Sequence, residues 1–254
     1  MPTRTPAPPR WQGRALWGAG EAALTLGAVL LLLVAHQLWW TNLRAHAAAT
    51  DRVNTLERQW DRAGTPGTPT PETSDQSAAA GRPAPRSRPP TGGTRTATRT
   101  ATPRPSQTYA VLRIPRIGVT APIAEGISRA KVLNHGYAGH YPHTAQPGQP
   151  GNFALAGHRN THGEPFRRID RLRPGDTLVV ETATTRYTYV VQQTVPRTTP
   201  SDGTVIAPVP HSTVHPRRHM TGPGRYITLT TCTPEFTSTH RLVVWGGLAA
   251  AEPR

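Results

Sequence analysis

The stretch RYITLTTCTPEFTSTHRLVVWGGL, residues 225–248, decides the fold class of this chain. Its two ends, 225–232 and 241–248, are rich in β-branched and apolar residues, which favours strands. The segment between them, TPEFTSTH, is short and polar and contains a proline, which is typical of a loop. The stretch therefore predicts two neighbouring strands, which a short loop can join as an antiparallel pair.

Similar strand-like runs recur through residues 108–250 and are separated by turn signals such as RPGD and TGPG. The strong runs are 109–119, 152–158, 176–182 and 186–195, and the weaker ones are 121–126 and 204–209. Only PFRRIDRL (165–172) is typical of a short helix. Many strands and one short helix predict an all-β barrel or sandwich.

Cys232 is the only cysteine of the chain, so an internal disulfide is excluded. Side chains alternate along a strand, which puts Ile227 and Leu229 toward the core and Cys232 on the face of Thr228 and Thr230. The cysteine also ends its strand just before a proline-containing loop. A buried structural cysteine and a reactive thiol both remain open at this point.

A thiol nucleophile needs a base or a cation beside it. His158 follows the strand ALAG and shares a face with Ala154 and Ala156. Arg241 starts the strand after the Cys232 loop, and antiparallel pairing would bring its guanidinium near the thiol. An arginine there could hold a substrate backbone or stabilise an oxyanion. Taken singly, a capping histidine and a surface arginine explain these residues equally well.

A second histidine pattern, H-x3-H-x3-H, would line up three ligands on a helix (His211, His215 and His219). Pro210 and Pro216 interrupt any such helix, so a metal site is not expected there. The remaining histidines of the loop-like sequence have no evident partner: His140, His143 and His162.

Residues 1–21 are basic, and residues 22–40 form an apolar run that ends in Trp39 and Trp40. At about 1.5 Å per residue this run reaches roughly 28 Å, close to a hydrocarbon core of about 30 Å. Tryptophan suits the membrane interface, and arginines before the span predict a cytoplasmic N-terminus and an extracytoplasmic remainder. We therefore expect a single-pass signal anchor in the cell membrane.

A cleaved signal peptide is the alternative, with 24–35 as its apolar region and AHAAAT (45–50) as the cleavage site. After the span, 41–61 is typical of a juxtamembrane helix. Residues 62–107 lack almost every large apolar residue and are rich in proline, threonine and arginine, which predicts a disordered linker. The folded domain then covers 108–250, followed by a tail.

The formal net charge is +15, divided almost evenly between residues 1–106 and 107–254. Nucleic-acid binding calls for a clustered basic footprint or a motif, and neither is found, so no nucleic-acid partner is expected. Attraction to lipid head groups or an anionic wall polymer fits the charge. The 28 arginines against one lysine, with abundant Ala, Pro, Gly and Thr, are typical of a GC-rich bacterial genome.

Together, NFALAGHRNTHGEPFRRIDRLRPGDTLVV (152–180) and LTTCTPEFTSTHRLVV (229–244) resemble the sortase family of bacterial transpeptidases. The similarity extends over essentially the whole domain, from residue 112 to residue 246. The TLTTC box, with an arginine nine residues after its cysteine, is most similar to class E, the actinobacterial housekeeping type. His162 departs from the pattern, because a tyrosine is expected at its position.

The resemblance implies an eight-stranded closed β-barrel with one or two short helices. It implies Cys232 as the nucleophile, His158 as the acid/base and Arg241 as the oxyanion or substrate-orienting group, without a cofactor or metal. Sortases cleave the sorting signal of an exported protein between Thr and Gly and pass the acyl group to a peptidoglycan-precursor amine. Class E relatives prefer Leu-Ala-x-Thr-Gly over Leu-Pro-x-Thr-Gly. Attachment of surface proteins to the cell wall is the function so implied.

Two alternatives remain beside this interpretation. A cysteine peptidase with the same residues would hydrolyse the acyl-enzyme instead of passing it to an amine. A non-catalytic wall-binding module would use the basic linker for binding and keep Cys232 as a structural residue. A reactive thiol is expected of the transpeptidase and of the peptidase, whereas the wall-binding module predicts an unreactive one.

Overall fold

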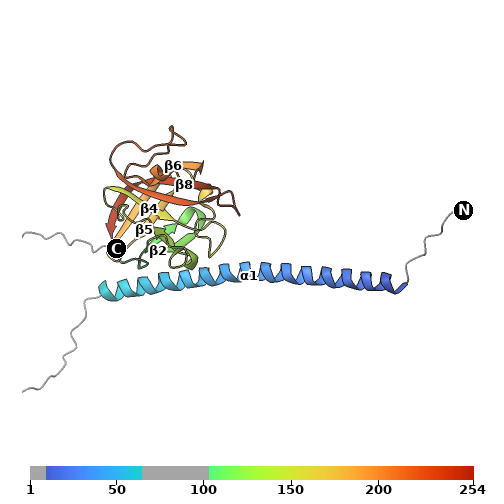
Figure 1. Ribbon diagram of the computed structural model, residues 1–254. Coiled ribbons are helices and arrows are strands. Elements are labelled where there is room, and N and C mark those ends of the chain that lie inside the picture. The colour runs from blue at the N-terminus through green and yellow to red at the C-terminus, as the bar shows by residue number, and fades with distance from the viewer. Residues whose placement is uncertain (1–9, 65–102) are drawn as a thin grey trace, which may run out of the picture.

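The computed structural model describes residues 10–64 and 103–254. One long helix, α1 (Arg10–Gly64), runs along the outside of a β-barrel, and its N-terminal half projects well beyond the barrel (Figure 1). Residues 1–9 of the predicted basic N-terminus and residues 65–102 of the predicted linker lie outside the described residues. The division of the chain into domains stays a prediction.

The barrel is closed and has eight strands, which confirms the expected fold class. In order around the barrel they are β1 (Thr108–Ile114), β2 (Val119–Glu125), β3 (Ala138–His140), β4 (Gly151–Ala156), β7 (Arg225–Thr233), β8 (His240–Pro253), β6 (Thr185–Thr198) and β5 (Thr177–Glu181). The pairs β2–β3 and β4–β7 are parallel, and the other pairs are antiparallel.

Strict alternation along the strands separates the barrel interior from its outer surface. On β7, Ile227 and Leu229 are fully buried in the interior core, as the sequence predicts. On β8, Leu242 and Val244 enter the same core, while Val243 and Trp245 point outward. The outward face of β7 and β8 is therefore available for a second layer of structure.

The loop between β6 and β7 supplies that second layer. It contains the short 3₁₀ helix η4 (Gly203–Ile206), whose Val205 packs on Trp245 and Tyr226. The indole Nε1 of Trp245 donates to the Val205 carbonyl over 3.0 Å. The weak prediction of a strand over 204–209 is therefore wrong, because these residues cover the outer face of the barrel instead of joining its ladder.

Other elements also differ from the sequence prediction. The expected helix over 165–172 is a series of turns that ends in the 3₁₀ helix η3 (Ile169–Arg171), because three of its apolar side chains are drawn into the barrel core: Phe166, Ile169 and Leu172. Residues 251–253, predicted as a tail, continue β8, since Pro253 pairs with Thr185 of β6. The short strand β3 and the 3₁₀ helices η1 (Pro115–Ile117) and η2 (Leu133–His135) were not predicted.

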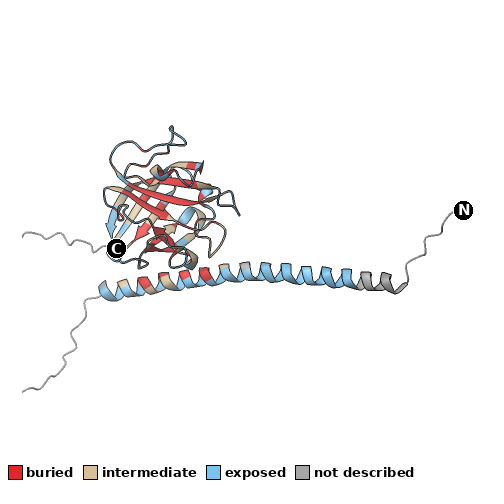
Figure 2. Ribbon diagram, viewed as in Figure 1, coloured by how far each residue is buried: buried red, intermediate tan, exposed pale blue. Residues whose placement is uncertain are grey.

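The C-terminal part of α1 docks on β1 and β2 through a stripe of buried residues, seen in red in Figure 2. The stripe consists of Ala45, Ala49, Val53 and Leu56, and Val53 and Leu56 pack against Val111 on the outer face of β1. The helix continues unbroken to Gly64, three residues into the segment predicted as linker.

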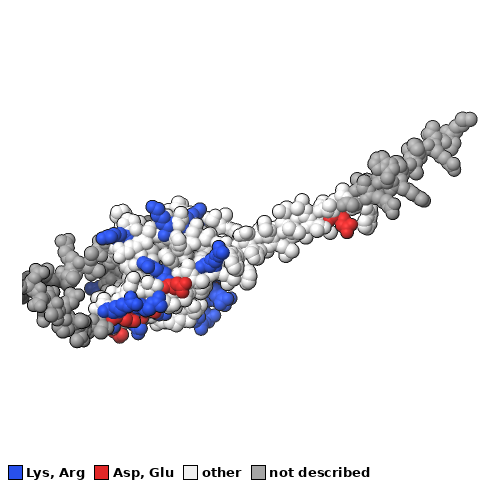
Figure 3. All heavy atoms as spheres, turned by 90° about the horizontal axis from the view of Figure 1, so that it is seen from below, with Lys and Arg blue, Asp and Glu red and all other residues white. Residues whose placement is uncertain are grey.

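The N-terminal part of α1 contains the one helix segment among the described residues that is long and apolar enough to cross a membrane. Its most apolar 18-residue window has a mean hydropathy of 1.9, and none of that window is buried. Figure 3 shows that this projecting part is almost free of charged side chains, whereas arginine and lysine dot the barrel surface. A single continuous helix thus has an exposed apolar N-terminal part, which is compatible with lipid, and a C-terminal part that packs on the barrel.

Candidate active site

Cys232 lies near the end of β7, the strand between β4 and β8. Its thiol is free and the residue is half-buried. In the register of β7 and β8, Cys232 is directly opposite Arg241. The structure therefore brings together the two residues that sequence reasoning placed across the loop.

His158 comes to the other side of Cys232 through the parallel pair β4–β7. Ala156 is in register with Thr230, and the pairing continues for one more residue. The Gly157 N–H donates to the Thr230 carbonyl over 3.1 Å, and the Thr231 hydroxyl donates to the Gly157 carbonyl over 2.8 Å. Since paired strands lie about 4.8 Å apart, His158 follows β4 beside the end of β7 that carries Cys232.

Strand alternation gives all three residues the same outward direction. Cys232 shares parity with Thr228 and Thr230, whose hydroxyls bond to the outward Asn152 and to the Leu155 carbonyl. His158 and Arg241 have the same parity on their own strands. A row of thiol, imidazole and guanidinium therefore lies across three neighbouring strand ends, on the outside of the barrel.

The imidazole of His158 is held by a hydrogen bond between its Nε2 and Asn134 Oδ1, 2.9 Å apart. With a carbonyl oxygen as its partner, Nε2 is the protonated nitrogen of the neutral ring, which leaves Nδ1 as the base. Burial, together with the neighbouring His162 and Arg129, lowers the pKa of His158 to about 4. The ring is therefore neutral near pH 7.

His162 stacks on His158 with the ring centroids 5.3 Å apart. Burial and the nearby His135 lower the pKa of His162 as well. The sequence placed this residue in a loop without a partner, and the structure makes it the ring neighbour of the candidate base. Nothing in the sequence pattern alone pointed to this contact.

Arg241 donates from Nη1 to the backbone carbonyls of Ser238 and His240, each over 2.9 Å. These bonds fix the guanidinium against its own β7–β8 loop. The described residues give no hydrogen bond to its other two nitrogens, Nε and Nη2. Those two donors are the part of the side chain that a substrate carbonyl or an oxyanion can use.

Arg159 is a site residue that sequence reasoning missed. It is only 7% exposed, and its Nη1 donates to Thr233 Oγ1 over 2.9 Å and to the Cys232 carbonyl over 3.4 Å. Asp170 lies 3.4 Å from its Nη2. The buried arginine thus ties the backbone of the candidate nucleophile to the segment after β4, and its place directly after His158 was the only signal for it.

A protein-family comparison matches residues 112–249 of the chain to the sortase domain. This match covers more than half of the chain and includes Cys232, His158 and Arg241. The chain belongs to the sortase family.

The most informative relatives of this sortase are class E enzymes. Sortase SrtE1 of Streptomyces coelicolor is 44% identical over 240 residues, which cover 92% of this chain and 57% of that protein. Sortase SrtE2 of the same organism is 32% identical over 96% of this chain and 86% of its own length. The chain thus spans little more than half the length of the first relative and most of the second.

Solved structures agree with this placement. A crystal structure of Sortase E1 from Streptomyces coelicolor, with a tripeptide in its active site, has a TM-score of 0.55 and 52% identity, over 60% of this chain and 94% of the other. Sortase E from Streptomyces avermitilis has a TM-score of 0.51 and 42% identity, over 59% and 93% of the two chains. The predicted family and its class E character are confirmed.

The other histidines of the sortase domain have structural surroundings. His140 lies in β3, not in a loop, and its Nδ1 is 2.7 Å from Glu125 Oε2. His211 and His219 form an isolated bridge, and His215 Nε2 lies 2.6 Å from the Arg197 carbonyl. Across residues 10–64 and 103–254, no three His, Cys, Asp or Glu side chains are grouped so that they could hold a metal ion.

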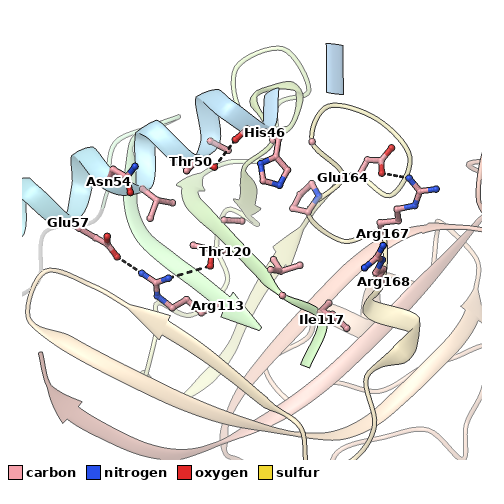
Figure 4. A pocket seen from close by; sticks show the side chains of 18 residues that line it. His46, Thr50, Asn54, Glu57, Arg113, Ile117, Thr120, Glu164, Arg167 and Arg168 are labelled. Carbon is pink, nitrogen blue, oxygen red and sulfur yellow. Dashed lines mark hydrogen bonds and ion pairs between the residues drawn. The ribbon is translucent and has the colours of Figure 1, made fainter. Parts of the chain in front are cut away.

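A cavity of about 520 Å³ lies between α1 and the barrel (Figure 4), and Cys232 is not among its lining residues. His46, Thr50, Asn54 and Glu57 line it from the helix, and Arg113, Thr120, Glu164, Arg167 and Arg168 line it from the barrel. Glu57 pairs with Arg113 at one end, and Glu164 pairs with Arg167 over 2.5 Å at the other. The cavity therefore borders the loop that carries His162.

Proposed function

We propose that this sortase is a membrane-anchored cysteine transpeptidase that attaches surface proteins to the cell wall. It cleaves a sorting signal of the Leu-Ala/Pro-x-Thr-Gly type between Thr and Gly and transfers the acyl group to a peptidoglycan-precursor amine. The observation that carries the proposal is the row of Cys232, His158 and Arg241 on three adjacent strand ends. Membership of the sortase family supports the same chemistry.

The first half-reaction forms an acyl-enzyme. The Cys232 sulfur, whose proton passes to the neutral imidazole of His158, attacks the threonine carbonyl carbon and forms a tetrahedral oxyanion. The free guanidinium donors of Arg241 are suited to stabilise that oxyanion. The C–N bond to glycine then breaks, the imidazolium returns its proton to the departing amine, and a thioester remains on Cys232.

The second half-reaction reverses the roles of the same groups. An incoming amine attacks the thioester carbonyl and gives a proton to His158. The C–S bond then breaks, and the imidazolium passes that proton to the leaving sulfur, which restores the thiol and the neutral imidazole. The new amide links the two substrates, so no oxidant or external energy source is needed. Ping-pong kinetics follow from the covalent intermediate.

Anchoring in the membrane is supported by α1 and by the arginines before its apolar part. Positive residues stay on the cytoplasmic side of a span, so the proposed orientation places the N-terminus inside and the barrel outside. The docked half of α1 then holds the barrel beside the membrane. Both substrates, exported proteins and wall precursors, meet the enzyme at that surface.

The test is a transpeptidation assay with the full chain in detergent or nanodiscs. Leu-Ala-x-Thr-Gly and Leu-Pro-x-Thr-Gly peptides are incubated with candidate amines, and the products are identified by mass. We expect the joined product from the native chain and a loss of about 10⁴-fold or more in Cys232→Ala, because no other thiol can form the acyl-enzyme.

Two outcomes would contradict the proposal. A folded Cys232→Ala variant that still joins peptide and amine would remove the assigned nucleophile. Release of the acid alone, at saturating amine, would favour the hydrolytic peptidase.

A further inference from the structure

The loop after His158 has an unusual backbone. Three consecutive residues have positive φ angles: His162 at 54°, Gly163 at 81° and Glu164 at 48°. Left-handed conformations cost about 1–2 kcal/mol for a residue other than glycine. Such a run persists only where surrounding contacts hold it, so the contacts of this loop identify what positions His162.

The side chain that holds the loop comes from helix α1. Asn42 Nδ2 donates to Glu164 Oε1 over 2.6 Å, and Asn42 Oδ1 accepts the Gly163 N–H over 3.3 Å. Gly163 is also packed closely, since a Cβ atom at this position would lie 3.3 Å from the His46 backbone nitrogen. The Nδ2 and Oδ1 atoms of Asn42 thus both bond to the two residues that directly follow His162.

The loop matters to the site because His162 stacks on His158. The two rings lie 5.3 Å apart at an interplanar angle of 28°. Burial, His162 and Arg129 lower the pKa of His158, and burial and His135 lower the pKa of His162. Asn134 is the hydrogen-bond partner of the His158 ring. A displaced His162 would therefore change the surroundings of the proposed acid/base.

We infer that Asn42 is a positioning residue of this sortase: through Gly163 and Glu164 it holds the His162 ring against His158, so the juxtamembrane helix completes the active site. The inference rests on the proposed function for its activity readout. It adds a residue 116 positions away from His158, on the element that leads to the membrane.

Docking of the helix does not depend on Asn42, which makes the inference testable. Val53 and Leu56 pack on β1, Glu57 pairs with Arg113, and Arg52 Nε donates to Thr108 Oγ1 over 2.5 Å. Replacing Asn42 by alanine removes its two hydrogen bonds to the loop and leaves these contacts between α1 and β1 in place.

The experiment compares Asn42→Ala with Asn54→Ala in the full chain. Asn54 lies on the same helix, where it lines the cavity between α1 and the barrel, and makes no side-chain hydrogen bond within the described residues. We expect Asn42→Ala to lower kcat/KM about tenfold, the effect of one to two lost hydrogen bonds, and to move the acid limb of the pH profile upward. Asn54→Ala should change neither, and circular dichroism verifies that both variants fold.

A double-mutant cycle separates positioning from a general structural effect. His162→Ala alone should reproduce the shifted pH limb, and adding Asn42→Ala to it should cause no further change, because the two residues act through one contact. Additive losses, or equal behaviour of Asn42→Ala and Asn54→Ala, would overturn the inference.

An NMR titration of ¹³C-labelled histidines tests the role of Asn42 independently of the proposed transpeptidase activity. The His158 signal, assigned with His158→Gln, should titrate at higher pH in Asn42→Ala than in the native chain. This measurement needs no substrate, so an enzyme that fails to join peptides can still confirm or refute the role of Asn42. An unchanged His158 titration would refute it.

Discussion

His158 is the residue whose environment sets how the proposed site begins its reaction. Its ring is half-buried, donates from Nε2 to Asn134, and lies near two other titratable groups, His162 and Arg129. The partial burial and the two neighbouring groups disfavour the imidazolium. The resting pair of Cys232 and His158 is therefore best described as a neutral imidazole beside a thiol.

The pH dependence of kcat/KM tests this description. Protonated His158 cannot accept the thiol proton, so activity should rise as pH increases through the pKa of His158. Because that pKa is lowered to about 4, the acid limb should lie near pH 4 instead of near the ordinary value of about 6.5. The measurement is kcat/KM for a sorting-signal peptide between pH 3.5 and 8.

Alkylation of Cys232 over the same pH range provides the control, because it reports ionisation of the thiol without the peptide. A rate limb near pH 6.5 would contradict a His158 whose pKa is lowered by its surroundings. A limb that coincides with the thiol titration would assign the dependence to Cys232 instead.

At the level of single residues, the sequence indicated the three candidate reactive residues but not the residues that hold them in place. Cys232, His158 and Arg241 lie at strand ends, and strand periodicity is visible in a single sequence. Asn134 and Arg159 were missed because their partners lie 24 and 73 residues away, at positions fixed only by barrel closure. Their contacts follow from the three-dimensional register, which composition and local pattern do not encode.

Among the elements, the longer strands were predicted because their sequences are β-branched or alternate between apolar and polar residues, whereas the three-residue β3 has no such pattern and was missed. The loop between β6 and β7 was not predicted, since Thr204–Val209 has strand-like composition but is used as a cover for Trp245. The turns around Phe166 likewise have helical periodicity without a helix. In both cases tertiary burial decided between local alternatives of similar free energy.

The Asp202 side chain joins the end of β6 to several residues of the β6–β7 loop by hydrogen bonds. Its carboxylate is 4% exposed and accepts bonds from the Thr198 and Ser212 hydroxyls, each over 2.6 Å. It also accepts from Thr204 Oγ1 and from the Thr213 backbone and hydroxyl. Burial alone would raise the pKa of Asp202, but these donors hold it well below its usual range.

We expect Asp202→Ala to lower the free energy of unfolding by about 2–4 kcal/mol, because several buried donors lose their acceptor. The stability that the charged Asp202 supplies should be complete above about pH 4 and lost only as pH falls toward its depressed folded pKa. Denaturant unfolding of the full chain in detergent measures both effects.

Asp51→Ala is the matched control, since Asp51 is exposed on α1 and its side chain has no bond within the described residues. Its change should stay within about 0.5 kcal/mol. Equal stability of the two variants would show that the Asp202 bonds contribute nothing net.

Across the whole molecule, α1 links a span-like segment to the barrel without a break. Its docked half is joined to β1 by the pair of Glu57 and Arg113, and Arg113 continues to Glu181 of β5 over 2.8 Å. Because the helix is continuous, the height and rotation of the barrel are tied to the span. In the proposed orientation, the site therefore faces a fixed direction relative to the membrane surface.

The single cysteine allows this topology to be tested in cells. Cys232 is half-buried and free, so a small membrane-impermeant maleimide should reach it wherever the barrel is outside the membrane. We expect labelling of the full chain in intact cells, with no gain on lysis and none in Cys232→Ala. The labelled protein should keep the mass of the uncleaved chain, because the apolar part of α1 continues directly into the docked helix. Labelling that appears only after lysis would place the barrel in the cytoplasm, and a loss of mass corresponding to cleavage near residue 50 would favour the signal peptide.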